Sequence, residues 1–198
     1  ILVCLVGSEM CIRDSTWGEL GFSLAMTSDG TRIVIGATGS KGVDGNGSNS
    51  GHVRVYDRDE DEALGWKQVG GDIDGEAQGD YSGYSLAMSS DGTRIAIGAP
   101  YNDGNGSDSG HVRVYDWYGS VDGWIQVGGD IDGEDQDDKS GYSVAMSSDG
   151  TRIAIGASGN DDNGQNSGHV RVYDHKIPTN DEWSLSLIHI SEPTRHTR

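Results

Sequence analysis

The sequence predicts an all-β fold of three consecutive four-stranded antiparallel units, and three observations support this prediction. An eleven-residue stretch at 89–99 recurs letter for letter at 147–157, and with two substitutions at 27–37. Apolar and polar residues alternate within each copy, as they do in a strand with one buried face. No part of the chain has the 3.6-residue apolar periodicity of an amphipathic helix.

Each copy of the stretch contains an Asp-Gly pair, at 29–30, 91–92 and 149–150. Asp-Gly between two apolar runs is typical of a hairpin with a type I′ turn, which needs a positive φ at both central positions. We therefore expect a Gly-aromatic-Ser strand before each turn and a Thr-Arg-Ile strand after it. The isoleucines of the second strand share one face and are expected to be buried between units: Ile33, Ile35, Ile95, Ile97, Ile153 and Ile155.

Two further strands are predicted in each unit. The sequence His-Val-Arg-Val-Tyr-Asp is identical at 52–57, 111–116 and 169–174. A tryptophan-led strand follows at 66–70 and 124–128, and its third copy stops at Trp183. A loop rich in Gly, Asn, Asp and Ser separates the second and third strands, and an acidic connector leads to the next unit.

The units recur at a nearly fixed spacing, which indicates a repeat architecture. Gly21, Gly83 and Gly141 stand at equivalent positions, 62 and 58 residues apart. Four short antiparallel strands per unit of this length predict blades of a β-propeller. A sandwich would not need near-identical units, and a parallel β-helix normally has shorter rungs. The expected blades span 16–81, 82–139 and 140–184, the last of them truncated.

The two ends of the chain do not follow the repeat. Leu5–Ser15 can be encoded by a DNA sequence whose reverse complement encodes Leu185–Thr194, and the relation continues outward to both ends. The ends also resemble a transposase-type sequencing adapter translated in frame. We interpret 1–15 and 185–198 as adapter-derived artefacts, which we expect to pack poorly or to follow their local composition. The only cysteines, Cys4 and Cys11, lie in the first of these segments.

The composition excludes two classes of partner. The chain has 198 residues, a net charge of −18 and 32 glycines. Such an acidic protein lacks the Lys and Arg excess that neutralises nucleic-acid phosphates or binds an anionic membrane surface. No segment reaches the roughly 18 apolar residues of a membrane-spanning helix. We therefore expect neither nucleic-acid binding nor membrane insertion by this segment.

A family resemblance rests on Gly83–Ala87 (Gly-Tyr-Ser-Leu-Ala) followed by Ile97–Pro100 (Ile-Gly-Ala-Pro). This pair of motifs resembles the FG-GAP repeat of integrin-α-type propellers, and weaker forms stand at 36–38 and 156–158. The resemblance covers 16–184 and implies propeller blades, usually seven, that are commonly extracellular and adhesive. The short Asp-Gly turn replaces the calcium loop that the integrin-like repeat has between its motif halves, so calcium is not expected there. The turn-and-strand stretch also resembles other bacterial-type propeller repeats.

Calcium is considered instead at the polar loops, where oxygen ligands stand at alternate positions. The candidate ligands are Asp44, Asn46, Ser48, Asp103, Asn105, Ser107, Asp161 and Asn163. These loops lack the sixth-position glycine and the distal Glu of an EF-hand, and a solvated turn is the alternative. The same two interpretations apply to the acidic residues of the connectors: Asp72, Asp74, Glu76, Asp130, Asp132, Glu134 and Asp135.

Two other residue types recur once per unit. His52, His111 and His169 are expected to be structural or at the surface, because equivalent residues on successive blades are a blade width apart. The tryptophans are expected to pack between blades rather than to form a carbohydrate platform: Trp66, Trp124 and Trp183. Asn46 and Asn105 each begin a glycosylation sequon on an exposed loop.

These features predict a non-catalytic binding or adhesion module, extracellular or on a cell surface. The strands are almost invariant, whereas the first loop is three residues longer than the other two, and loops on a rigid scaffold usually carry binding. A protein or glycan ligand is expected at loops 38–50, 100–109 and 158–167. No unit departs from the repeat with its own acid, base or nucleophile. Two alternatives remain open: the propeller domain of a larger multidomain enzyme whose catalytic residues lie outside this fragment, or a structural surface repeat.

Overall fold

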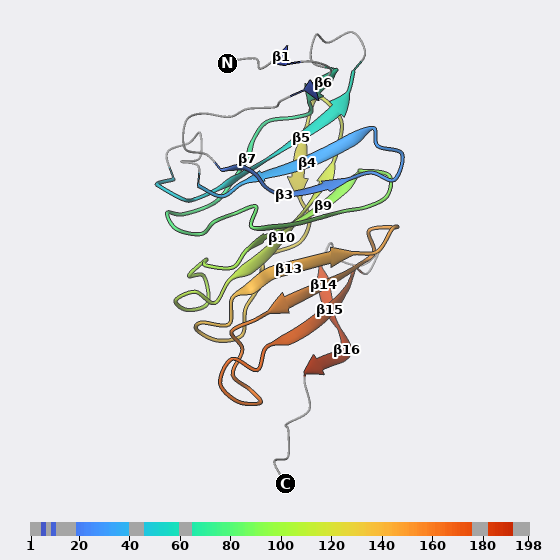
Figure 1. Ribbon diagram of the computed structural model, residues 1–198. Helices are drawn as coiled ribbons and strands as arrows, with labels where there is room; N and C mark the ends of the chain where they lie inside the picture. Colours follow the sequence, from blue (N-terminus) through green and yellow to red (C-terminus); the bar gives the residue numbers. More distant parts are fainter. Residues whose placement is uncertain are drawn as a thin grey trace.

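The computed structural model describes residues 5–6, 9–10, 19–39, 46–59, 65–175 and 182–191, with side chains from residue 19 to residue 186 within those ranges. Every regular element in these ranges is a β-strand, so the predicted all-β class is confirmed. No helix among the described residues is long and apolar enough to span a bilayer. Three sheets lie one above another, in chain order (Figure 1).

Each sheet is an antiparallel meander of four strands, which we call a blade. Blade 1 pairs β3 (Leu20–Met26), β4 (Arg32–Ala37), β5 (His52–Arg58) and β6 (Trp66–Gln68) in that order, with β7 (Ile73–Asp74) also beside β5. Blade 2 pairs β8 (Ser85–Met88), β9 (Arg94–Ala99), β10 (His111–Trp117) and β11 (Trp124–Gln126), with β12 (Ile131–Asp132) beside β10. Blade 3 pairs β13 (Ser140–Met146), β14 (Arg152–Ala157), β15 (His169–His175) and β16 (Trp183–Ser191). A separate pair joins β1 (Leu5–Val6) and β2 (Glu9–Met10).

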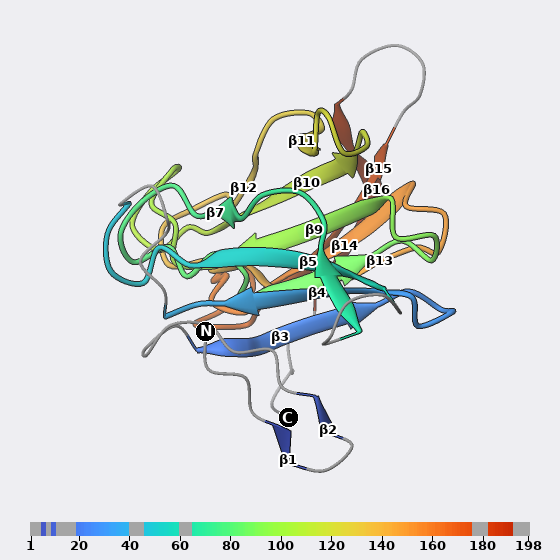
Figure 2. The same cartoon turned by 90° about the horizontal axis from the view of Figure 1, so that it is seen from above.

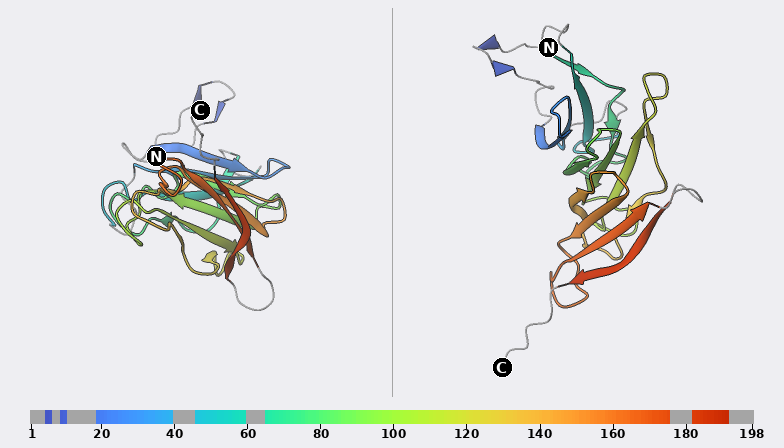
Figure 3. Two further views of the ribbon diagram at one scale, coloured as in Figure 1. Left: turned by 90° about the horizontal axis from the view of Figure 1, so that it is seen from below. Right: turned by 90° about the vertical axis from the view of Figure 1, so that its right-hand side faces the viewer.

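The blades are arranged as an open segment of a propeller. Seen from above, the sheets lie over one another with their strands running in similar directions (Figure 2). The first strands of successive blades are neighbours, because β8 contacts both β3 and β13. Figure 3 shows the three sheets fanning out along the stack. Among the described strands, none of blade 1 pairs with one of blade 3, so the three blades do not close a ring.

The hydrophobic core lies between the blades. Val34, Val53 and Val55 of blade 1 pack against Ile95 and Ile97 of blade 2. Blade 2 repeats this contact with blade 3 through Ala96, Val112, Val114, Ile153 and Ile155. The predicted burial between units is therefore confirmed for Ile95, Ile97, Ile153 and Ile155. Ile33 and Ile35 lie on the face of blade 1 that points away from blade 2 and belong to neither core, although Ile35 is buried and Ile33 half-buried.

The Asp-Gly hairpins form at the predicted places, but the predicted type I′ geometry is wrong. Gly30, Gly92 and Gly150 have positive φ values near 70°, and none of the preceding aspartates does. The N–H of Gly30 donates to the Thr27 carbonyl at 3.0 Å, so Gly30 is the last residue of the turn. The Asp29 carboxylate accepts hydrogen bonds from the Thr27 hydroxyl and from the N–H and hydroxyl of Thr31. These bonds favour a four-residue turn whose last residue is a glycine in the left-handed conformation.

The Gly-aromatic-Ser and Ile-Gly-Ala motifs form one contact between blades. A Cβ atom on Gly98 would lie 2.2 Å from the carbonyl oxygen of Gly141 in the next blade. The Ser85 hydroxyl donates to the same carbonyl at 2.7 Å. Gly36, Ser23 and Gly83 repeat this arrangement between blades 1 and 2. Only glycine allows so close an approach of two backbones.

A repeated arginine joins the blades at their turn ends. Arg94 donates two hydrogen bonds to Asp116 of its own blade, at 2.6 and 2.7 Å. It also donates to the Gly150 carbonyl in the turn of blade 3, at 2.9 Å, and lies over the Trp183 ring. Arg32 makes the same bonds to Asp57 and to Gly92 of blade 2. The side chain of Arg152, with no described blade beyond it, is 61% exposed.

The predicted tryptophan role is confirmed where a preceding blade is described. The Trp124 indole N–H donates to the Val69 carbonyl of blade 1 at 3.1 Å, and the ring packs on the core between the blades. Trp183 packs in the same way on the next core.

The fourth strand of blade 3 runs from Trp183 through residues 185–191, which we interpret as adapter-derived. Its pairs His175↔Trp183 and Tyr173↔Leu185 correspond to Arg58↔Trp66 and Tyr56↔Gln68 of blade 1. Strand pairing uses backbone groups, so a segment rich in Leu and Ile can fill an open sheet edge whatever its origin.

Candidate functional site

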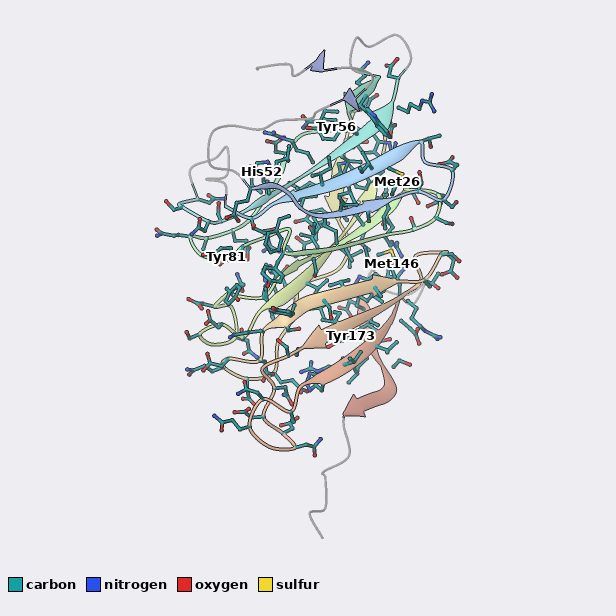
Figure 4. All side chains as sticks on the ribbon, viewed as in Figure 1. Met26, His52, Tyr56, Tyr81, Met146 and Tyr173 are labelled. Atoms are coloured by element: carbon teal, nitrogen blue, oxygen red, sulfur yellow. The ribbon has the colours of Figure 1, made fainter. Side chains whose placement is uncertain are left out.

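The polar loops and the connectors meet at one end of the blades, which we call the loop face. Its described parts are 46–51, 100–110 and 158–168 from the loops, and 75–84 and 133–139 from the connectors. His52 and Tyr81 lie at this end, whereas Met26 and Met146 lie toward the opposite end (Figure 4).

Asparagine side chains fix the loops to the connectors. Asn105 Nδ2 donates to the carbonyls of Gly133 and Glu134, at 2.7 and 3.1 Å, and Asn46 Nδ2 donates to that of Gly75 at 2.7 Å. Asn102 donates to the buried carboxylate of Asp80, at 2.9 Å, across the boundary between blades. These bonds join the loops to the connectors across the loop face.

A second buried carboxylate, Asp138, repeats the role of Asp80. It accepts a hydrogen bond from Asn160 at 3.1 Å and from the backbone N–H groups of Glu134 and Asp135. Since buried polar groups need hydrogen-bond partners, these bonds account for its presence below the loop face.

The candidate calcium ligands lie on separate loops, with turn-forming contacts in each. Asp103 Oδ1 accepts the N–H of Asp108 at 2.9 Å, and Asp161 Oδ1 accepts that of Asn166 at 2.5 Å. The side-chain amides of Asn46 and Asn105 point their nitrogens at connector carbonyls, as described above. Ser48, Ser107 and Asn163 lie on the same loops, and Asp44 lies outside the described residues.

Two other groups of side chains have ligand atoms close enough together to hold a metal ion. They are Glu76, His111 and Asp130, and Glu134, Asp162 and His169, with the ligand atoms of each group within 4.8 Å of one another. Sequence reasoning considered the other five residues only separately and did not single out Asp162. Their common feature in the sequence is a glutamate in each connector, whose partner residues stand in the next blade.

An arginine neutralises the acids of the first group. Arg113 forms ion pairs with Glu76, from the preceding connector, and with Asp130 at 2.9 Å. Arg171 pairs likewise with Glu134, at 2.6 Å. Because guanidinium groups satisfy these carboxylates, the arrangement serves first as an ionic contact between blades. His111 and His169 are buried beside this contact, which agrees with the structural role expected for the recurring histidines.

Burial and charge shift the pKa values in this contact. Desolvation lowers the pKa of His111, so the ring is neutral near pH 7. In blade 1, two hydrogen bonds from Arg54 hold the pKa of Asp72 below its usual value. The lowered pKa of Asp72 favours its ion pair with Arg54 at neutral pH, whereas the lowered pKa of His111 favours an uncharged ring beside the ion pairs.

Five aromatic rings gather where the first strands reach the loop face, and we call them the aromatic cluster. Phe22, Tyr84 and Tyr142 stand at equivalent positions of the three blades, with successive ring centroids 4.9 Å apart. Tyr101 lies beside Tyr84, and Tyr81 lies 5.2 Å from Tyr101. Hydrogen bonding to Tyr142 and burial raise the pKa of Tyr84. The sequence placed these residues in strands and loops but did not indicate that their rings meet.

The accessible part of the aromatic cluster is at its ends. Tyr142 is 41% exposed and Phe22 50% exposed. The ammonium group of Lys139 lies 5.7 Å from the centroid of the Tyr101 ring. Exposed aromatic faces next to polar loops provide the mixture of apolar and polar contacts that small-ligand sites use.

Comparison with known families supports the sequence resemblance. The FG-GAP repeat family model matches residues 73–115 and 131–173. FG-GAP repeats are thus found at these two ranges of the chain. Each matched repeat begins in a connector and ends in the His-Val-Arg-Val-Tyr strand, so it includes the connector glutamate and the arginine that pair with each other, Glu76 with Arg113 and Glu134 with Arg171. FG-GAP repeats are typical of extracellular or periplasmic proteins.

A solved structure has a similar fold. The periplasmic gluconolactonase PpgL of Pseudomonas aeruginosa matches with a TM-score of 0.56 and 19% sequence identity, over 87% of this chain and 44% of that one. The chain thus spans less than half the length of that protein. At this identity the likeness concerns the fold alone. No curated protein sequence matches the chain significantly.

The expectation that this segment is not an enzyme is contradicted by that comparison. A protein with this fold is a gluconolactonase, an enzyme. The regular strands misled the sequence argument, since catalytic groups are carried by particular loops on a scaffold that many functions share.

Proposed function

We propose that these FG-GAP blades belong to the propeller domain of a larger enzyme that works outside the cytoplasm. The loop face would contact a substrate of carbohydrate type. The family match and the likeness to a periplasmic enzyme support the domain and its location. The observation that carries the ligand proposal is the aromatic cluster, which presents Tyr142 and Phe22 to solvent beside the polar loops.

A carbohydrate suits this surface for a physical reason. Sugar rings present C–H faces that pack on aromatic rings, and hydroxyl groups that bond to amides and carboxylates. Asn105 and Asp103 offer such groups on the neighbouring loop, where their backbone is held by the contacts described above.

The catalytic groups are expected on parts of the enzyme beyond the described residues. Within the loop face, Asp80 and Asp138 are bonded to asparagines, and Glu76 and Asp130 are paired with Arg113. Such groups are committed to structure and are poorly suited to proton transfer.

Calcium at the loop residues named above remains part of the proposal, as a second ligand of the same face. Carboxylate and amide oxygens at alternate positions are the ligands that Ca²⁺ prefers. Calorimetric titration of the chain with CaCl₂, before and after Asp103→Ala, tests it. Heat of binding that is unaffected by this substitution would contradict calcium at the loop 100–109.

The carbohydrate proposal is tested by screening the chain on an array of neutral and acidic oligosaccharides, with D-glucono-1,5-lactone and gluconate added as soluble probes. We expect binding that Tyr142→Ala weakens at least tenfold. Val121→Ala is the matched control, because Val121 is 92% exposed on the loop between β10 and β11. Failure of every probe to bind, or binding equally strong in the Tyr142→Ala variant, would refute the proposal.

A further inference from the structure

Two positions of the repeat change their residue type between units. The first position lies two residues before the first glycine of each unit, and its occupants are Glu19, Tyr81 and Lys139. The second position follows the Ala-Pro pair of unit 2. It is occupied there by Tyr101, whereas units 1 and 3 have Gly39 and Gly159. Since the repeated residues build the scaffold, residues that differ between units are where a specific function is sought.

The first of these positions has an unusual backbone conformation. Glu19, Tyr81 and Lys139 have φ values of 50°, 54° and 56°, in the left-handed region that side chains rarely adopt. Glycine would relieve this strain, yet each unit has a large polar side chain there. Strained positions cluster at binding and catalytic sites, where the side chain that they hold has a function.

The side chains that differ between units meet on one ring. Tyr81 lies against the Tyr101 ring, with the two centroids 5.2 Å apart. The Lys139 ammonium group lies over the same ring, 5.7 Å from its centroid. All three residues are half-buried, so they are packed and still reachable from solvent. They meet at the junction of blades 2 and 3, at the end of the stack where Figure 4 labels Tyr81.

This group offers hydrogen-bond donors to a ligand. Within the described ranges the Lys139 ammonium forms no ion pair, whereas Arg113 and Arg171 are paired with the connector glutamates. The Tyr81 hydroxyl accepts a hydrogen bond from Asn49 Nδ2 at 3.1 Å, which leaves its own O–H as a donor. An ammonium group has donors only, so a ligand that satisfies both groups must supply acceptor oxygens. An anionic ligand satisfies Lys139 best.

The acids around this group limit the charge that a ligand can carry. Asp103, Asp135 and Asp137 are exposed on the neighbouring loop and connector. Their field repels a polyanion, whereas a single carboxylate can be neutralised by Lys139. The tyrosine rings favour a ligand with C–H faces over a small inorganic anion. A sugar with one carboxylate meets these conditions.

We propose that Tyr81, Tyr101 and Lys139 form a subsite for a sugar that carries one carboxylate, such as a hexuronic acid. Lys139 pairs with the carboxylate, the sugar ring packs on the tyrosine rings, and the Tyr81 hydroxyl donates to a sugar oxygen. This inference rests on the proposed carbohydrate function and narrows its substrate class. The subsite lies within the stack, where the blades on both sides of it are described.

Titration of the chain with sodium D-glucuronate and with its neutral counterpart, D-glucuronamide, tests the proposal. Amide NMR spectra give the dissociation constant of each sugar and show that each variant is folded. We expect glucuronate to bind about tenfold more tightly than the amide, the effect of one charge-assisted hydrogen bond. This preference should shrink as the NaCl concentration is raised, because salt screens the ion pair.

Three variants separate the charge from the ring. Lys139→Gln should bind both sugars equally, and Lys139→Arg should keep the preference for glucuronate because it keeps the positive charge. Tyr101→Leu should weaken both sugars alike, because it removes the ring on which they pack. Lys67→Gln is the matched control, since Lys67 is exposed on β6 opposite Asp57, toward the turn end of blade 1.

The outcomes distinguish this proposal from the carbohydrate function on which it rests. Glucuronamide that binds as tightly as glucuronate, or a Lys139→Gln variant that keeps the preference, would overturn the subsite alone, because a sugar still binds. Binding of neutral oligosaccharides without any binding of glucuronate would also overturn the subsite alone. If no sugar binds in any of these assays, both proposals are wrong.

Discussion

Replacing Arg94 by alanine tests the contact that joins the blades at their turn ends. The guanidinium is held by Asp116 through two short hydrogen bonds and by the Gly150 carbonyl through a third. Its side chain is 11% exposed, and that of Asp116 is 22% exposed. Removing one member of a fully buried pair costs about 3–5 kcal/mol, and the partial exposure of Asp116 puts the expected loss near the lower limit, about 3 kcal/mol.

Arg152→Ala is the matched control, because it removes the same residue type from the same position of the repeat. Arg152 has its bond to the aspartate of its own blade but faces no described blade. We therefore expect the unfolding free energy of this variant to stay close to that of the parent.

Urea unfolding followed by tryptophan fluorescence measures the difference. Trp183 lies against Arg94 and reports on the same contact. A loss of about 3 kcal/mol corresponds to a fall in melting temperature of roughly 6–12 °C for a chain of this size. The reasoning is refuted if the two variants lose the same stability, because the contact across blades would then contribute nothing.

Three other predictions concern separate parts of the chain. Gly98→Ala should cost about 2–3 kcal/mol of unfolding free energy in the same urea titration, since its Cβ would meet the Gly141 carbonyl. Gly156→Ala should cost less, because its Cβ would meet only the side chain and carbonyl of Ser143. Burial lowers the pKa of His111, so below about pH 6.5, the usual pKa of histidine, the unfolded chain binds more protons than the folded one and stability should fall. The melting temperatures of wild type and His111→Gln, measured from pH 8 to pH 5, should therefore converge at the acid end. Deleting residues 185–198 should leave the stability of blades 1 and 2 unchanged, as measured by hydrogen exchange of their backbone amides. Loss of protection of the amides in β4 would contradict this.

The strands were predicted well because each strand pattern recurs from one unit to the next. The alternation in His-Val-Arg-Val-Tyr-Asp identified the buried valines, and the spacing of Gly21, Gly83 and Gly141 identified the blades. The turn geometry was predicted wrongly, because the Asp29 carboxylate bonds to Thr27 and Thr31 and so stabilises a different turn. A dipeptide preference does not contain that information.

Contacts between blades were beyond the sequence argument. Glu76 and Arg113 are 37 residues apart, and their pairing follows only from the order and stagger of the sheets. The aromatic cluster was missed for the same reason, since Phe22, Tyr84 and Tyr142 meet only when the first strands lie together. The prediction that this segment is not an enzyme was wrong because it rested on the repeated strands. These strands form the scaffold and carry no information on the chemistry of loops or of further domains.

The successive stacking of blades, on which the whole account depends, is tested most directly by a disulfide within one chain. Ser90 and Ser148 lie in the turns of blades 2 and 3, with Ser90 N and the Ser148 carbonyl oxygen 2.9 Å apart. In a chain with Cys4→Ser and Cys11→Ser, the pair Ser90→Cys and Ser148→Cys should oxidise to an intramolecular bond without loss of melting temperature. The pair Ser28→Cys and Ser148→Cys, from blades that are not neighbours, should stay reduced in the same background. If the first pair stays reduced, or the second closes as readily within one chain, the blades do not stack in the order described.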